Sequence, residues 1–358
     1  MCARARPTRR RGLDRSEHQV SAPLLAARGL TVDYRVGRGH LRAVDHVDLD
    51  LYQGQTLALI GESGSGKSTI AGALLRLVPL AGGSIEFDAL DWVSLRGAAL
   101  RRERHRMQFV PQDAGSSLDP RWRVRESVAE PLVVAGTSPR QARDRAGSML
   151  DRVGLEGALQ ERFPHQLSGG QRQRVAIARA LISRPRLVIC DEAVSALDVS
   201  LQAEIVNLLM ELRAERDLTY VFITHDIALL PYVADRVAVL YLGQVIESGP
   251  ARDVLVDPQH PYTRGLLSAL PGARATGGPD RSVRGEIPDP AHPPSGCRFH
   301  PRCPVAIGDC AQIEPPVATV SPAHSAACHL LTPDYEAADH PAAPPVPPSP
   351  SLLRKARS

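Results

Sequence analysis

Apolar positions along this chain follow a period of two in some segments and helical spacing in others. Val47, Leu49 and Leu51 alternate with polar residues in the segment 44–52, as in a half-buried strand. Apolar runs predict further strands at 55–61, 84–90, 107–112, 186–192, 219–226 and 236–249, and longer segments predict helices at 68–78 and 201–215. Strands and helices in turn predict an α/β fold with a largely parallel sheet.

Changes in composition divide the chain into four predicted segments. Residues 1–22 are polar and rich in arginine, so we expect a disordered basic leader there. Residues 23–258 hold the predicted strands and helices, with an Arg-rich helical subdomain at about 115–180 that includes a helix start at Ser138-Pro139. Irregular, Pro-rich sequence predicts a small extension at 259–331 and a disordered Pro-rich tail at 332–358.

The charge of the chain is unevenly distributed. Lys and Arg number 43 and Asp and Glu 39, a net charge of +4, but residues 1–15 alone hold six arginines. The remainder is almost neutral, which argues against a nucleic-acid-binding domain. No apolar run reaches the roughly 20 residues of a transmembrane helix, and the N-terminus lacks the apolar segment of a secretory signal. We therefore expect an intracellular protein with reduced thiols.

The segment GESGSGKST follows a predicted strand and begins a predicted helix. It matches the nucleotide-binding P-loop pattern G-x-x-x-x-G-K-[ST], in which backbone N–H groups and the helix N-terminus face the phosphates. Lys67 is one of only two lysines in the chain, and its compact ammonium can reach the β- and γ-phosphates of ATP. Ser68 is expected to bind Mg²⁺. The predicted nucleotide-binding residues are Gly61, Glu62, Ser63, Gly64, Ser65, Gly66, Lys67, Ser68 and Thr69.

Two acidic residues follow the buried strand predicted at 186–192. Asp191 lies at the carboxyl end of this strand, the edge at which open α/β sheets bind ligands. We expect Asp191 to hold Mg²⁺ and Glu192 to act as the base for the attacking water. Cys190, within the strand, is expected to be core packing.

The segment LSGGQRQR (167–174) resembles the signature of ATP-binding-cassette (ABC) ATPases. Other elements of that family occur in the same order: Gln112 in FVPQD, SALD at 195–198 and His225 in ITHD. The resemblance covers residues 24 to about 250 and implies a P-loop NTPase fold of the ABC ATPase type. This chain has Ala193 where the family form DEPVSALD has proline.

The resemblance also implies roles for these residues. Two cassettes of the family pair head to tail, so that Ser168, Gly169, Gly170 and Gln171 of one cassette close over the ATP of the other. Glu192 and His225 would carry hydrolysis, and Gln112 would contact Mg²⁺ and report to a transmembrane partner. Tyr34, upstream of the P-loop, would stack on the adenine ring.

Two further segments resemble the ATPase subunits of bacterial oligopeptide and dipeptide importers. They are SSLDPRWRVRESVAEPL (116–132) and HPYTRGLLSALP (260–271). The resemblance implies an ATPase bound peripherally at the cytoplasmic face of the membrane, with a homologous second ATPase in a heterodimer, two permease subunits and an extracytoplasmic solute-binding protein. The permease is expected to contact Gln112 and residues 113–135.

Alternatives to peptide import stay open at this stage. Import of nickel or another small solute could use the same machinery. A soluble ABC ATPase that acts on nucleic acid or ribosomes is the rival class, but its long coiled coil, second cassette or close C-x-x-C pairs are not seen in this sequence.

Four cysteines cluster in the predicted extension, with the spacing Cys297-x5-Cys303-x6-Cys310-x17-Cys328. Four thiols suit an iron–sulfur cluster or tetrahedral zinc, and these loose spacings favour the larger group. Extensions of some peptide-importer ATPases carry a [4Fe–4S] cluster at similar spacing, so the resemblance favours that cofactor. Zinc and four free thiols remain the alternatives.

Overall fold

The computed structural model describes residues 22–37, 39–195, 197–268, 283 and 285–332. The predicted basic leader and Pro-rich tail lie almost entirely outside these residues, and so does Ala196 of the SALD segment. The predicted domain boundaries therefore stay predictions.

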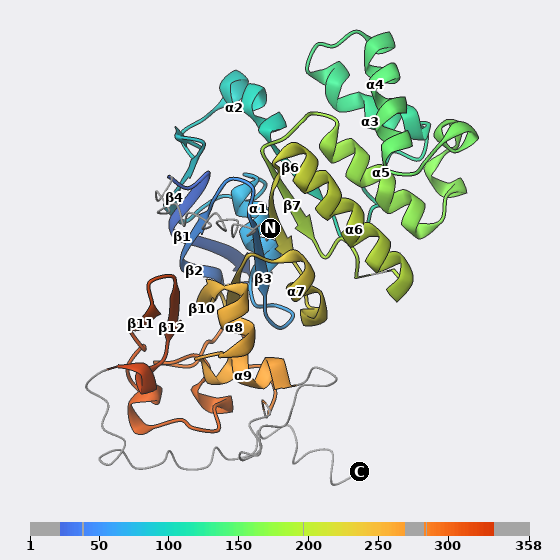
Figure 1. Cartoon of the computed structure of the whole chain (residues 1–358). Coiled ribbons are helices and arrows are strands. Elements are labelled where there is room, and N and C mark those ends of the chain that lie inside the picture. The colour runs from blue at the N-terminus through green and yellow to red at the C-terminus, as the bar shows by residue number, and fades with distance from the viewer. Residues whose placement is uncertain (1–21, 38, 196, 269–282, 284, 333–358) are drawn as a thin grey trace, which may run out of the picture.

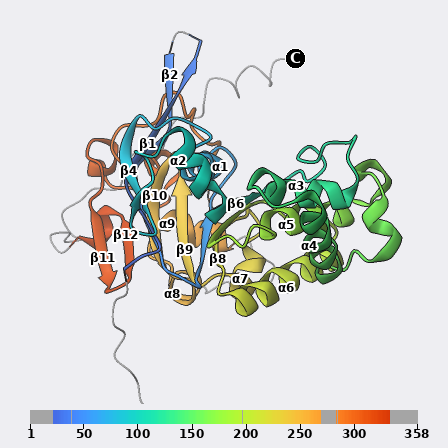
Figure 2. The same ribbon diagram turned by 90° about the horizontal axis from the view of Figure 1, so that it is seen from above.

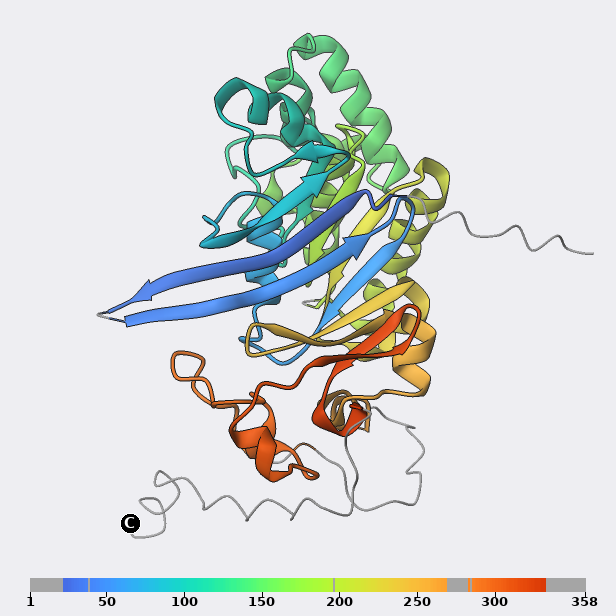
Figure 3. The same cartoon turned by 90° about the vertical axis from the view of Figure 1, so that its left-hand side faces the viewer.

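Two β-sheets form the frame of the molecule (Figure 1). The smaller sheet is antiparallel, in the order β2-β1-β4-β5, and consists of β1 (Leu25–Val36), β2 (Gly39–Leu51), β4 (Gly82–Phe87) and β5 (Leu90–Asp91). Its strands β1 and β2 run beyond the body of the molecule as a long ribbon (Figure 3). The alternation at Val47, Leu49 and Leu51 is confirmed as a strand, with all three side chains buried.

The larger sheet has the order β11-β12-β10-β9-β3-β8-β7-β6. Its centre is parallel, as predicted, and contains β3 (Thr56–Ile60), β6 (Met107–Val110), β7 (Leu187–Asp191), β8 (Thr219–Ile223) and β9 (Arg236–Tyr241). The antiparallel strands at one edge are β10 (Gln244–Pro250), β11 (Val317–Ser321) and β12 (His324–Ala327). The carboxyl ends of the parallel strands therefore meet at one edge of the sheet.

Helices cover the sheets and form a separate lobe. The described helices are α1 (Lys67–Leu74), α2 (Gly97–Glu103), α3 (Val124–Val134), α4 (Pro139–Arg152), α5 (Gly169–Leu181), α6 (Val199–Arg216), α7 (Leu230–Val233), α8 (Ala251–Val256) and α9 (Pro261–Ser268). Helix α4 begins at Pro139, as the Ser138-Pro139 pair predicts. Figure 2 shows α3 to α6 on one side of the central strands and β11 and β12 on the other.

Three buried hydrophobic clusters hold these layers together. One lies between the antiparallel sheet, α1 and one face of the main sheet, and a second packs α3 to α6 against the other face. Cys190 is fully buried in the second cluster, which confirms its assignment to the core. The third cluster joins β3 and β9 to α8, α9 and Phe299 of the extension.

The C-terminal extension is more regular than its Pro-rich sequence predicts. It contributes α9 and the β11–β12 hairpin, and β12 pairs with β10 so that the main sheet continues into the extension. The sequence did not predict this hairpin, because each strand is short. His324 and Ala326 are the two buried positions of β12, and two alternate positions, one of them a histidine, are too few to indicate a strand.

Candidate nucleotide site

The P-loop connects the end of β3 to the start of α1, as the sequence predicts. Lys67 is 6% exposed, and its Nζ donates to the carbonyl oxygens of Gly61 at 2.7 Å and Glu62 at 2.9 Å. Burial lowers the pKa of Lys67, and the nearby carboxylates of Glu192 and Asp191 oppose that shift. The ammonium is thus placed beside the loop backbone, at the point where phosphates are expected.

Two glycines of the P-loop could not carry a side chain. Gly61 and Gly66 have φ angles of 147° and 104°. A Cβ atom on Gly61 would lie 2.2 Å from the carbonyl oxygen of Leu240, and one on Gly66 would lie 2.5 Å from that of Ala43. The curled loop therefore packs directly on the backbone of two neighbouring segments.

Two of the three residues predicted to bind Mg²⁺, Ser68 and Asp191, are in contact. Ser68 Oγ donates to Asp191 Oδ1 at 3.1 Å, and Asp191 ends β7. Burial raises the pKa of Asp191, while the hydrogen bond from Ser68 lowers it. A hydroxyl and a carboxylate oxygen at this distance suit Mg²⁺, which prefers oxygen ligands and commonly uses only one or two from the protein.

Glu192 lies between Gln112 and His225, which come from two other strand ends. Its Oε2 accepts a hydrogen bond from Gln112 Nε2 at 2.8 Å, and its Oε1 lies 3.2 Å from His225 Nδ1. The backbone of Glu192 is left-handed, with φ of 47°, and its N–H donates to the carbonyl of Ile223 in β8. This conformation is uncommon for a residue other than glycine and occurs directly after the end of β7.

The signature residues form the start of α5. Ser168 caps this helix: its hydroxyl accepts from Gln171 N at 3.3 Å, and its own N–H donates to Gln171 Oε1 at 3.0 Å. Ser168 and Gly169 are exposed, whereas Gly170 packs so closely on Leu201 that a Cβ atom would lie 2.2 Å from it. Within the described part of the chain, no hydrogen bond joins these residues to the P-loop.

Tyr34 lies in β1, opposite Leu41 of β2. Its side chain is half-buried and packs against the hydrophobic cluster between the two sheets. Stacking of Tyr34 on adenine stays a prediction.

The four cysteines of the extension are neighbours, and the thiols of the described residues are free. The backbone N–H of Cys297 donates to the carbonyl of Cys310 at 2.8 Å. Burial raises the pKa of Cys297 to about 11 and that of Cys303 to about 12, and the other thiols add to both shifts. The described residues nonetheless contain no group of three or more His, Cys, Asp or Glu side chains arranged to hold a metal ion. The donor set suits a metal, but the arrangement gives the iron–sulfur prediction no support.

Arg302 and Tyr262 reach the P-loop from the extension, and the sequence did not single out either residue. Both contact Glu62. The only signal in the sequence was position: Arg302 directly precedes Cys303 in a segment already marked by its cysteines.

Comparison with known proteins places these residues in a family. The ABC transporter family model matches residues 44–195, and the model described as the oligopeptide/dipeptide transporter C-terminal region matches residues 246–310. A Brucella ovis protein named for peptide import and ATP binding is 46% identical over 311 residues, which cover 86% of this chain and 98% of the relative. A similarly named Brucella abortus protein is 48% identical over 296 residues, 82% of this chain and 88% of the relative.

Solved structures have the same fold. A dimeric ATP-binding cassette in a post-hydrolysis state, bound to ADP and phosphate, superposes with a TM-score of 0.59 at 32% identity, covering 64% of this chain and 99% of that one. A second dimeric structure of the same cassette, described as a bacterial ABC transporter cassette, matches equally well. No helix among the described residues is long and apolar enough to cross a membrane. The chain therefore belongs to the ABC transporter family, as an ATPase that carries the oligopeptide/dipeptide transporter C-terminal region.

Proposed function

We propose that this chain is the ATP-hydrolysing subunit of a bacterial peptide importer. The observation that carries the proposal is the meeting of three groups at one edge of the main sheet. These are the P-loop with Lys67, the Ser68–Asp191 oxygen pair, and Glu192 held between Gln112 and His225. The names of the Brucella relatives and the matched C-terminal region support peptides as the transported solute.

Each residue has a separate task in hydrolysis. Lys67 and the P-loop N–H groups bind the phosphates, and bound Mg²⁺ would neutralise part of their charge. Glu192 takes a proton from the attacking water, because its carboxylate is near enough to Lys67 to influence the pKa of that ammonium and accepts a hydrogen bond from Gln112. His225 lies on the other oxygen of Glu192 and faces solvent, where the γ-phosphate is expected.

Glu192→Gln tests this assignment. We expect phosphate release to fall at least about 100-fold, because the amide cannot accept the proton, while ATP binding is retained. Glu215→Gln is the matched control, since Glu215 is an exposed carboxylate near the end of α6 that pairs with Arg152 of α4. Hydrolysis at the wild-type rate by the Glu192→Gln variant would contradict the assignment of Glu192 as the base.

The exposed signature supports a dimer in which each ATP lies between two cassettes. Ser168 and Gly169 offer a hydroxyl and a helix N-terminus to a ligand that their own P-loop does not supply. We propose a head-to-tail pair with a homologous second ATPase, at the cytoplasmic face of the membrane and bound to two permease subunits that receive peptide from a solute-binding protein. ATP should increase the dimer fraction of the Glu192→Gln variant mixed with the second ATPase in size-exclusion chromatography.

A groove on the helical lobe is suited to the permease. It is lined by α3 and α4 and includes the exposed apolar side chains of Trp122, Val133 and Val134, rimmed by Glu126 and Arg143. We propose that it binds a short cytoplasmic helix of the permease. An apolar stripe in a charged rim is the surface that an amphipathic helix fits.

We also propose that the four cysteines bind a [4Fe–4S] cluster, with zinc as the alternative. The shared neighbourhood of the thiols and the small core of the extension support a metal as a staple for this segment. The test is the iron, sulfide and zinc content of protein purified without oxygen. About four irons and four sulfides, lost on Cys303→Ser, would establish the cluster, and absence of all three from a folded, active chain would overturn it.

A further inference from the structure

The C-terminal extension contacts the second residue of the P-loop with two side chains. Arg302 donates to both carboxylate oxygens of Glu62, at 2.6 and 3.0 Å. The hydroxyl of Tyr262 accepts from the backbone N–H of Glu62 at 2.9 Å. The backbone carbonyl of Glu62 accepts a hydrogen bond from the ammonium of Lys67 at 2.9 Å. Glu62 is therefore held by the extension and is itself in contact with the phosphate-binding lysine.

Arg302 is buried beside aromatic rings. It is 8% exposed, and its guanidinium lies 5.8 Å from the centre of the Tyr241 ring. Tyr241, Tyr262 and Phe299 pack on one another with ring centres 4.9 to 5.4 Å apart. A planar guanidinium that donates two parallel hydrogen bonds to a carboxylate fixes the orientation of that carboxylate. Buried Arg302 therefore defines the position of the Glu62 side chain.

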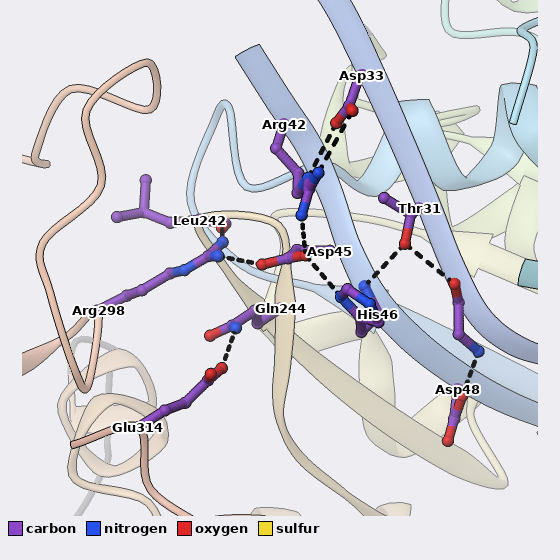
Figure 4. Close-up of polar contacts among 11 residues, drawn as sticks. Thr31, Asp33, Arg42, Asp45, His46, Asp48, Leu242, Gln244, Arg298 and Glu314 are labelled. Carbon is purple, nitrogen blue, oxygen red and sulfur yellow. Dashed lines mark hydrogen bonds and ion pairs between the residues drawn. The ribbon is translucent and has the colours of Figure 1, made fainter. Parts of the chain in front are cut away.

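The segment that contains Arg302, residues 297–303, also contacts two residues beside the one that bonds to Ser65 of the P-loop. Arg298 forms an ion pair with Asp45 and donates to the carbonyl of Leu242, as Figure 4 shows. The next residue, Gly243, donates its N–H to the carbonyl of Ser65 in the P-loop and accepts from the N–H of Asp45, both at 2.9 Å. Residues 297–303 thus contact the P-loop directly at Glu62, and contact Asp45 and Leu242 next to the residue that bonds to Ser65.

We propose that Arg302 is a positioning residue for the nucleotide site, which holds the P-loop backbone ready for ATP through Glu62. The inference rests on the proposed function, because it assumes that this P-loop binds ATP. A loop fixed in advance loses less conformational freedom on binding, so ATP binds more tightly. The extension, whose cysteines flank Arg302, is thereby linked to nucleotide affinity.

The experiment measures binding of a fluorescent ATP analogue to the full-length chain, with its melting temperature recorded in parallel. For Arg302→Ala we expect Kd to rise about ten-fold, the scale of one hydrogen bond to a charged group. Arg302→Lys should recover part of the affinity, because it keeps the charge but loses the paired geometry. Glu314→Ala is the matched control: Glu314 accepts from Gln244 across the same interface, without touching the P-loop (Figure 4).

Glu62→Gln keeps the test decisive if Arg302→Ala does not fold. The Kd of the Glu62→Gln variant for the ATP analogue should also rise. The double variant Glu62→Gln/Arg302→Lys should have nearly the same Kd as Glu62→Gln, because the two residues act through one contact. A lowered melting temperature with unchanged Kd in the folded Arg302 and Glu62 variants would overturn the inference. Failure of the wild-type chain to bind the analogue, with Lys67→Ala as the null, would instead overturn the proposed function.

Discussion

At the scale of single residues, the site depends on the two oxygens of one carboxylate. Gln112 and His225 lie on opposite oxygens of Glu192, and the left-handed backbone of Glu192 places the carboxylate between them. These two contacts, one on each oxygen, orient the carboxylate of Glu192. His225 is the more exposed of the two side chains proposed to be catalytic, with 59% of its side chain accessible against 21% for Glu192.

His225→Ala tests the role of that exposed imidazole. We expect kcat to fall about 100-fold with little change in KM, because His225 would act on the γ-phosphate and the water and not in ATP binding. Steady-state phosphate release over a range of MgATP concentrations separates the two parameters. His105→Ala is the control, since His105 is exposed and its ring lies against the carbonyl of Arg102. An equal loss of kcat in both variants would contradict the assignment.

Lys67, Asp191 and Glu192 could be predicted from the sequence, because the P-loop follows one buried strand and the acidic pair stands at the carboxyl end of another. His225 was implied by the resemblance of ITHD to the family, and the strand pattern alone does not single it out. Arg302 could not be predicted, because its partner Glu62 is 240 residues away and the segment between its cysteines has no periodic pattern. Long-range ion pairs leave no trace in local sequence.

At the scale of elements, α3 carries an unusual surface for a helix of this length. Val133 and Val134 at its end are 42% and 72% exposed, and Trp122 just before it is 40% exposed, while the opposite face is buried in the helical lobe. Apolar side chains that are grouped in a groove at a helix end usually indicate a partner. The sequence predicted a permease contact at 113–135, and α3 is the described helix in that range.

Val134→Asp tests the groove. A charge in the apolar stripe should weaken permease binding at least about ten-fold, because hot-spot side chains at such interfaces are desolvated on binding. Co-purification of tagged chain with co-expressed permease subunits measures the effect. Val256→Asp is the matched control, since Val256 is 78% exposed at the end of α8 and outside the groove. Equal recovery of permease with both variants would exclude α3 as the contact.

At the scale of the whole molecule, the extension is a continuation of the cassette. Glu247 of β10 is 1% exposed and accepts hydrogen bonds from the N–H groups of Gln259 and His260. His324 of β12 lies 2.8 Å from the same carboxylate, in a pair that is buried on both sides. A single buried carboxylate thus joins strand β10, the start of α9 and the β11–β12 hairpin, so unfolding of the extension would leave this charge without partners.

His260 makes this junction sensitive to acid. Its ring is 1% exposed, packs on Phe299 and accepts from the N–H of Tyr262, and burial together with the charge of Arg264 lowers its pKa to about 3. In the unfolded chain the pKa of a histidine is about 6.5. Because the unfolded state binds the extra proton, the free energy of unfolding decreases as the pH falls below 6.5, by about 1.4 kcal/mol per pH unit.

His260→Asn isolates this contribution, because an amide oxygen can accept from Tyr262 but does not titrate. Glu247, His324 and Arg264 face the junction and are the same in both proteins, so the comparison reports on His260. Urea unfolding at about pH 7.5 and about pH 5.5 should show the wild type losing roughly 1.4 kcal/mol more than the variant. Identical losses would mean that His260 is protonated in the folded protein and that the junction opens to water. The expected difference would instead mean that His260 stays neutral in the folded protein and that acid destabilises the junction through the unfolded state, at the start of α9, the helix from which Tyr262 reaches the P-loop.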